Sequence, residues 1–163
     1  MPRAVPSIRI LPMSEKLPGF RGRSIEEVQR RVFGRDLVNG SGRWPHQKAG
    51  LNAPRGTLVL FQFKARIIAS AIFLRDEKFE RPRRGCSGVL HFDADSIQTF
   101  APLDAADMRR IWPSFRAFGH VKQHLNPAMY PKLKRQMTVN AKTPRTPGNQ
   151  REPEMNADER RAR

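Results

Sequence analysis

Residues 56–73, GTLVLFQFKARIIASAIF, form the most apolar run of the chain and constrain its fold more than any other segment. The run is as long as a short membrane-spanning helix, but Lys64 and Arg66 would place two cations at the bilayer centre, which is costly. The run instead predicts two strands, 57–63 and 66–74, that are joined tightly at Lys64-Ala65. Alternate residues face opposite sides, with Thr57, Val59, Phe61 and Phe63 on one and Leu58, Leu60 and Gln62 on the other. Because both sides are mostly apolar, we expect both faces of this hairpin to be covered.

The segments before the hairpin predict a strand, a helix and a long loop. The strand spans 7–13, and the helix spans 24–34. Ser24 and Glu27 match the spacing of a capping box at the start of that helix, and Gly34 suits its end. Residues 35–55 are rich in Gly, Asn, Pro and Arg, with Trp44 as the large apolar residue near their centre, and predict a loop with a short edge strand.

The segments after the hairpin predict a charged connection, two strands and two helical regions. The connection spans 76–85, and the strands 89–92 and 96–100 flank a turn at Asp93-Ala94-Asp95. A helix is predicted over 103–112, with Asp104 at its start. A final helical region spans 119–137, interrupted near Asn126-Pro127 and at Pro131, with Tyr130, Leu133 and Met137 on one face.

The charge of the chain indicates an anionic partner. Lys and Arg total 31 against 15 Asp and Glu, which gives a net charge of +16. Residues 140–163 contain six Lys/Arg, four Asp/Glu and no Leu, Ile, Val, Phe, Trp or Tyr. We therefore expect a disordered tail there and a single domain over 1–139 that holds most of the charge. DNA or RNA is the first candidate partner and an anionic membrane surface the second; basicity without a specific partner is the alternative.

Targeting and catalytic signals are weak. Pro2, Pro6 and Pro12 interrupt the N-terminus, which lacks the apolar core of a signal peptide, so we expect a soluble, cytoplasmic protein without cofactor. His120 and His124 would share a helix face, but no third ligand supports a metal site. The chain has no P-loop, GxGxxG, GxSxG or paired-Cys motif, and Cys86 is its one cysteine. These absences favour a non-catalytic protein.

Cations, one loop aromatic and a late helix start make up the predicted nucleic-acid site. Basic residues would contact phosphates, Trp44 would stack on an unpaired base or close the core, and the segment 116–123 places an aromatic, a cation and an amide at a helix start. The candidate contacts before the central hairpin are Arg43, Trp44, His46 and Lys48. Those after it are Arg83, Arg84, Phe118, Lys122 and Gln123, with Arg30, Arg31, Arg35 and Arg81 as further cations.

The order strand, capped helix, Trp-containing loop and central hairpin resembles the PUA-like superfamily, especially its EVE/ASCH/YTH-like group. The segments that carry the resemblance are G-x-x-V-L-F-Q (56–62), I-x-A-S-A (67–71) and F-D-x-D-S-I (92–97), within a likeness that covers residues 7–137. In prokaryotes such domains occur alone or fused to HNH or McrB-type restriction nucleases. The resemblance implies an α+β fold in which a small, twisted, partly closed β-barrel is flanked by helices.

The resemblance also implies binding of RNA, or of DNA with a modified base, by flipping a nucleotide into an aromatic pocket. Trp44 would form a wall of that pocket, and Gln62 and Ser70 would be polar groups within it if their side chains point inward. No HNH motif is present, so a defence-associated nuclease or other effector would act in trans. Two other functions stay open: a small ASCH-like hydrolase acting on a nucleoside or RNA, and a basic protein-interaction module.

Overall fold

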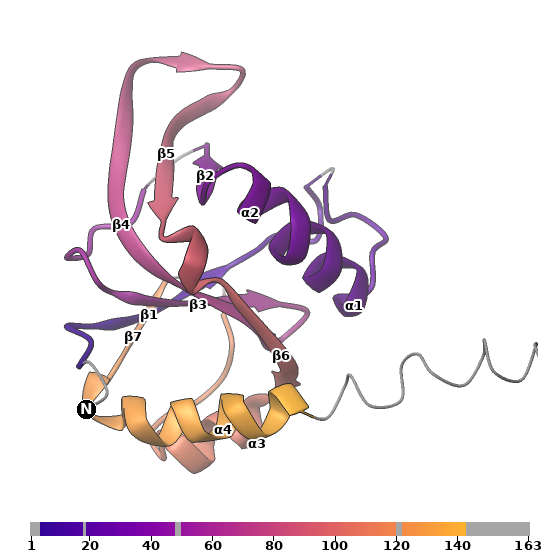
Figure 1. Cartoon of the computed structure of the whole chain (residues 1–163), viewed down its shortest axis with the longest axis vertical. Helices are drawn as coiled ribbons and strands as arrows, with labels where there is room; N and C mark the ends of the chain where they lie inside the picture. Colours follow the sequence, from indigo (N-terminus) through magenta and orange to yellow (C-terminus); the bar gives the residue numbers. More distant parts are fainter. Residues whose placement is uncertain (1–3, 18, 48–49, 120–121, 143–163) are drawn as a thin grey trace, which may run out of the picture.

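The computed structural model describes residues 4–17, 19–47, 50–119 and 122–142, which form a mixed α+β domain (Figure 1). Seven strands make one sheet in the order β2-β5-β4-β3-β1-β7, with β6 paired to β4 beside that path. The strands are β1 (Ile8–Pro12), β2 (Arg43–His46), β3 (Leu58–Phe63), β4 (Arg66–Arg83), β5 (Cys86–Phe92), β6 (Gln98–Leu103) and β7 (Gln123–Leu125).

The expected α+β class is confirmed, whereas the sheet is open rather than a partly closed barrel. Among the described residues no ladder joins the two ends of the strand order, β2 and β7. The long strand β4 explains this arrangement. Its first part pairs with β3 and with β6, and its second part continues past both and pairs with β5. The sheet therefore extends outward along β4 and β5 instead of returning to its first strand.

The predicted hairpin forms β3 and β4, with Lys64 and Ala65 at the turn. Both turn residues have positive φ, 52° and 56°, as a two-residue hairpin turn of type I′ requires. Alternation along β3 then places Phe61 and Leu60 on opposite faces of the sheet. Both faces are covered, as the apolar pattern predicted.

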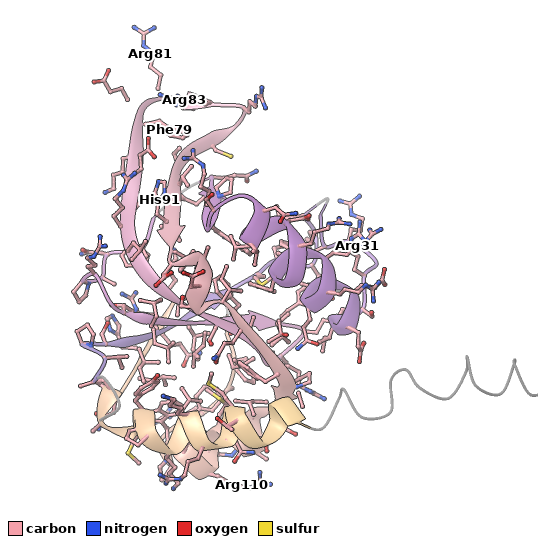
Figure 2. All side chains as sticks on the ribbon, viewed as in Figure 1. Arg31, Phe79, Arg81, Arg83, His91 and Arg110 are labelled. Atoms are coloured by element: carbon pink, nitrogen blue, oxygen red, sulfur yellow. The ribbon has the colours of Figure 1, made fainter. Side chains whose placement is uncertain are left out.

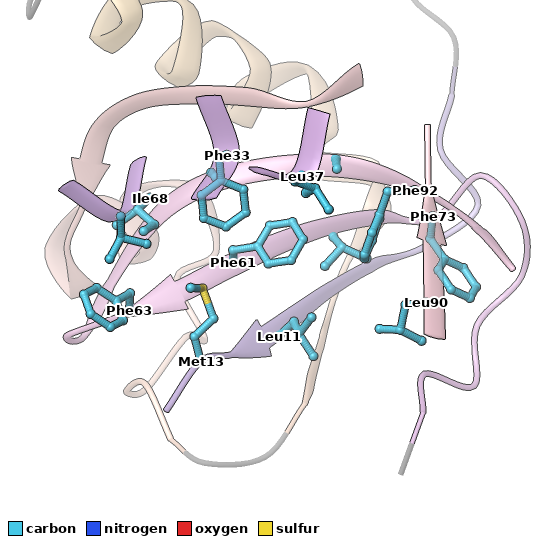
Figure 3. Close-up of a cluster of buried hydrophobic side chains, with 14 of the residues drawn as sticks. Leu11, Met13, Phe33, Leu37, Phe61, Phe63, Ile68, Phe73, Leu90 and Phe92 are labelled. Carbon is cyan, nitrogen blue, oxygen red and sulfur yellow. The ribbon is translucent and has the colours of Figure 1, made fainter. Parts of the chain in front are cut away.

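Each face of the sheet carries its own core. On one face, helical residues Val28, Phe33 and Leu37 pack with Phe61 and other buried residues of the strands (Figure 3). On the other face, residues of α3 (Ala105–Ile111) and α4 (Tyr130–Lys142) pack against β1, β3 and β6. Leu133 and Met137 of α4 are buried there, and Tyr130 packs beside them, which confirms the predicted face.

The first helix begins as predicted and ends later than predicted. The Ser24 side chain accepts a hydrogen bond from the Glu27 amide, and the Glu27 carboxylate accepts one from the Ser24 amide, which confirms the capping box. Helical structure continues through α1 (Ile25–Val28), a π-helical segment (Gln29–Asp36) and α2 (Leu37–Asn39), so the stop at Gly34 was wrong. Leu37 is 3% exposed, so its burial in the core favours continuing the helix past the glycine.

Two other segments differ from their predictions. The connection expected at 76–85 is mostly an extension of β4, which runs to Arg83 and turns into β5. The helical region expected from 119 contains β7, which pairs antiparallel with β1. In both segments polar side chains obscured the strand pattern, because these strands lie at the periphery of the sheet and gain little apolar burial.

The remaining helices follow their sequence signals. Asp104 caps α3 and shares a second capping box with Asp107, and Pro131 lies in the first turn of α4 without interrupting it. Short 3-10 turns occur at Ala94–Ser96, where the Asp93 turn was expected, and at Pro127–Met129. Helix α4 runs past the boundary expected after residue 139, and residues 143–163 of the expected tail lie outside the described residues. No helix in the described ranges is long and apolar enough to cross a membrane.

Gly42 and Gly85 provide a matched test of the packing between β2 and β5. Both have φ +79°, so an alanine at either would adopt a left-handed backbone at a cost of about 1–2 kcal/mol. A Cβ at Gly42 would also overlap the Phe92 carbonyl oxygen, whereas a Cβ at Gly85 meets nothing within 4 Å. We expect Gly42→Ala to lower the free energy of unfolding by about 1–3 kcal/mol more than Gly85→Ala. Urea titrations of both variants measure this difference, and equal losses would contradict the predicted contact.

Candidate nucleic-acid interface

Trp44 lies on β2, an edge strand that pairs only with β5 within the described sheet. Its ring is half-buried and nearly parallel to those of Phe20 and Phe33, with centroid distances of 6.3 and 5.9 Å. The Phe61 ring lies 5.0 Å away. Trp44 therefore packs against the first core and also keeps part of its ring accessible.

The accessible part of Trp44 faces a pocket of about 500 Å³, within the size range of ligand sites. The pocket lies between β2, the first helix and the segment around Phe20. Its walls combine aromatic and aliphatic side chains with the arginines Arg23, Arg31, Arg35 and Arg43. We call the residues that line this pocket, among them Phe20, Trp44 and the four arginines, the tryptophan pocket.

Two of the four arginines in this pocket have close acidic partners. Arg35 lies 3.0 Å from Asp36, and Arg23 lies 3.8 Å from Glu27. Among the described residues Arg31 and Arg43 form no ion pair, although each lies in the field of a carboxylate, Glu27 or Glu77 respectively. The pocket thus combines an apolar wall with a positive rim, which suits a planar ring attached to an anionic group.

The C-terminal end of β2 carries a second polar arrangement. The His46 Nε2 atom donates to Asp76 Oδ1 at 3.0 Å, and Asp76 Oδ2 accepts from the Leu51 amide at 3.2 Å. The lack of a side chain at Gly50 and Gly88 makes room for this pair. A Cβ at Gly50 would overlap Asp76, and a Cβ at Gly88 would overlap His46. The pair borders a cavity of about 830 Å³. The His46 Nδ1 atom is buried and has no partner among the described residues.

Gln62 and Ser70 do not face the tryptophan pocket. Ser70 is 1% exposed and lies opposite Leu60, which belongs to the core on the other face of the sheet. The Gln62 Nε2 atom donates to the Gly119 carbonyl at 3.0 Å. Both residues alternate with Phe61 along the paired strands, so the register that points Phe61 toward Trp44 points them away. The structure therefore places both side chains away from the tryptophan pocket.

The residues expected at a late helix start are also apart from Trp44. Phe118 packs against Phe115 in the second core, with ring centroids 5.1 Å apart. Gln123 lies on β7 and donates to the Ala117 carbonyl at 3.1 Å, and Lys122 precedes it. His124 lies on the same strand, while Lys48 and His120 lie outside the described residues. Within the described ranges no group of three His, Cys, Asp or Glu side chains is arranged to hold a metal ion.

Of the predicted arginines, Arg43 lines the tryptophan pocket with Trp44, whereas Arg83 and Arg84 do not. Arg83 and Arg84 lie at the turn between β4 and β5 (Figure 2). Sequence reasoning missed Phe20 and Arg23, which contribute to the tryptophan pocket. The turn-rich segment 17–23, just before a capped helix, was the signal available for them, but their proximity to Trp44 depends on tertiary packing.

No protein-family model and no curated protein matches the sequence. Among solved structures, the chain has a likeness to the N-terminal domain of Thermococcus gammatolerans McrB bound to m5C DNA. The sequences are 9% identical, and the match covers 82% of this chain and 98% of that chain with a TM-score of 0.47. At that identity and TM-score the likeness assigns neither a fold family nor a function to this chain.

Glu77 on β4 lies beside His91 of β5 and within the fields of Arg43 and Arg75. Its Oε1 atom accepts from His91 Nε2 at 2.9 Å, and Arg75 lies 4.0 Å away. The hydrogen bond from His91 and, to a smaller degree, the fields of Arg75, His91 and Arg43 hold the pKa of Glu77 below the usual 4.5, although desolvation opposes this shift.

The lowered pKa of Glu77 predicts a pH-dependent contribution to stability. Because the folded-state pKa is depressed, the contribution is complete above the pKa of the unfolded chain and is lost as pH falls through the folded-state pKa. We expect the difference in unfolding free energy between the wild type and Glu77→Gln to shrink from about pH 6 to about pH 3. Denaturant titrations at several pH values test this. Glu80→Gln is the control, because Glu80 forms no ion pair in the described chain; an equal pH trend in the control would refute the role of Glu77.

Proposed function

We propose that this chain is a non-catalytic reader of nucleic acid, of the EVE-like type within the PUA-like group, that holds an unpaired, flipped or modified base in the tryptophan pocket. The observation that carries the proposal is the half-buried Trp44 ring beside a pocket of about 500 Å³ with an arginine rim. Stacking would bind the base, and the arginines would bind the phosphates on either side of it.

Preorganisation of Trp44 supports this assignment. Three aromatic rings, those of Phe20, Phe33 and Phe61, contact Trp44 and restrict its motion. A ring that is already ordered loses little conformational entropy when a base stacks on it. Flipping a base out of a duplex costs a few kcal/mol, so the pocket must recover that energy by stacking and by polar contacts. Arg31 and Arg43, which form no ion pair in the described chain, are the available polar groups.

A small hydrolase is the second candidate, and the His46–Asp76 pair is the observation that favours it. A carboxylate that orients an imidazole is a common arrangement for a general base. The free nitrogen of His46 is enclosed by protein atoms, however, so a substrate could reach it only after a rearrangement. We therefore favour the reader, with any cleavage supplied by an effector in trans.

Trp44 is the residue on which the reader proposal depends most. We expect Trp44→Ala to weaken binding of oligonucleotides with an unpaired base by about 1–3 kcal/mol, because a stacking surface is lost. Trp44→Phe should retain part of the affinity. Fluorescence anisotropy with single-stranded DNA, single-stranded RNA and duplexes containing one mismatch or one modified base measures the effect and selects among the substrates.

Trp112→Phe is the matched control, because Trp112 is buried in the second core and its Nε1 atom donates to the Asn126 carbonyl at 3.0 Å. This change should alter stability without altering affinity. In the Trp112→Phe background, quenching of Trp44 fluorescence by the bound base would report stacking directly. Unchanged affinity in a folded Trp44→Ala variant would refute the reader.

The arginine rim predicts salt-dependent binding. Each phosphate contact releases counterions, so affinity for oligonucleotides should fall steeply between about 50 and about 300 mM salt. Arg31→Ala with Arg43→Ala should reduce the slope of log affinity against log salt by about 1–2. A flat salt response would reject phosphate contacts. Turnover of nucleosides or RNA by the purified protein, abolished by His46→Ala, would instead favour the hydrolase.

A further inference from the structure

The ends of β4 and β5 form an arm that projects from the body of the domain (Figure 1). We define the arm as residues 78–86. β2 accompanies β5 only as far as the pairing of His46 with Gly88, and β4 pairs with β5 from Lys78↔Gly88 to Arg83↔Cys86. From Gly88 toward the turn between β4 and β5, the described ladder therefore consists of β4 and β5 alone. Between these two pairs the register shifts, so that residues 79–82 of β4 lie opposite the single residue Ser87, and such an irregularity bends and twists a ribbon.

The arm concentrates positive charge at the tip of this ribbon. It carries four exposed cations and one carboxylate, and within the described chain none of these charges is in an ion pair: Lys78, Arg81, Arg83, Arg84 and Glu80. The Arg83 guanidinium lies 4.3 Å from the centroid of the Phe79 ring (Figure 2). This cation–π contact restrains the guanidinium while its N–H groups stay available for hydrogen bonds.

The body of the domain does not require this arm for its core. None of residues 78–86 belongs to either buried cluster. Charged residues, a proline and a bulge do protect a sheet edge against pairing with another chain. Protection alone would be served by charges of either sign, whereas the arm carries four cations, one of them ordered over an aromatic ring.

We propose that the arm enters the major groove of B-form duplex DNA next to the base that the tryptophan pocket holds. Two paired strands are about 4.8 Å apart, and with their side chains they fit a groove about 12 Å wide. The major groove of duplex RNA is too narrow for such an element. Arg83, held on Phe79, is placed to contact a base edge, and Arg81 and Arg84 are placed to contact phosphates.

The strand register predicts how far the arm reaches. Trp44 pairs with Leu90 on β5, and Cys86 at the base of the turn is four residues farther along. At about 3.3 Å per residue this is about 13 Å, the length of about four base pairs at 3.4 Å each. The position of the arm relative to a flipped base thus rests on the proposed function, whereas its contact with a duplex does not.

The test measures how affinity depends on duplex length. The DNA probes are duplexes of about 7 and about 17 base pairs with closed ends and a central mismatch. A fully paired long DNA duplex and a long RNA duplex complete the set. The arm variant combines Arg81→Ala, Arg83→Ala and Arg84→Ala. The control combines Lys132→Ala, Lys134→Ala and Arg135→Ala on α4, which removes the same charge at the far end of the molecule. Anisotropy titrations at several salt concentrations give affinities and salt slopes.

For the wild type, the long DNA should bind more tightly than the short DNA. The arm variant should lose that gain, and its salt slope on long DNA should fall by about 2–3, while the control variant keeps both. Glu80→Gln should raise affinity for long DNA about two-fold or more, a gain that misfolding could not produce. Equal losses in the arm and control variants, no loss in the arm variant, or equal effects on duplex RNA would overturn the proposal.

The same titrations separate the arm from the reader function. Loss of the preference for the mismatched over the fully paired duplex in Trp44→Ala tests the pocket and does not involve the arm. A wild type with no preference for the mismatch, but with an arm-dependent gain from duplex length, would refute the flipped base and retain the arm. A mismatch preference without any arm effect would retain the flipped base and refute the arm.

Discussion

The packing of aromatic rings around Phe61 is the interaction on which the rest of this structure depends. Phe61 is fully buried on the central strand β3, and its ring centroid lies 4.8 Å from that of Phe33, 5.0 Å from Trp44 and 5.3 Å from Phe92. These partners come from the first helix, the edge strand β2 and β5. One side chain thus joins the first helix and β2, which line the tryptophan pocket, to β5, and these ring contacts add to the burial of apolar area.

The two faces of the sheet have different roles in the proposed function. The face with Phe61 orders Trp44 and leaves part of its ring accessible, whereas the other face is covered by α3 and α4 and holds Ser70 inside. β5 connects the pocket to the arm, because it pairs with β2 along one edge and with β4 along the other. A single strand can therefore set both the position of a stacked base and the reach of the arginines beyond it.

Local signals in the sequence predicted local structure well. The Ser24 and Asp104 caps, the Lys64-Ala65 turn and the strands β3 and β1 all depend on residues close together in the chain or on strong apolar alternation. The arm and β7 were missed because polar strands at the periphery of a sheet lack that alternation. The stop at Gly34 was wrong because burial of Leu37 outweighed the preference of glycine for a helix end.

The sequence by itself determined that this chain builds a covered hairpin on a strongly basic domain, because residues 56–73 are apolar on both faces while cations outnumber acids two to one. Only the tertiary structure decided which side chains share a site. It brought Phe20, Arg23 and Arg31 to Trp44 and turned Gln62 and Ser70 away, since strand register sets the face of every residue along a strand. Register and long-range packing arise from contacts between distant segments, and no local pattern in one sequence encodes them.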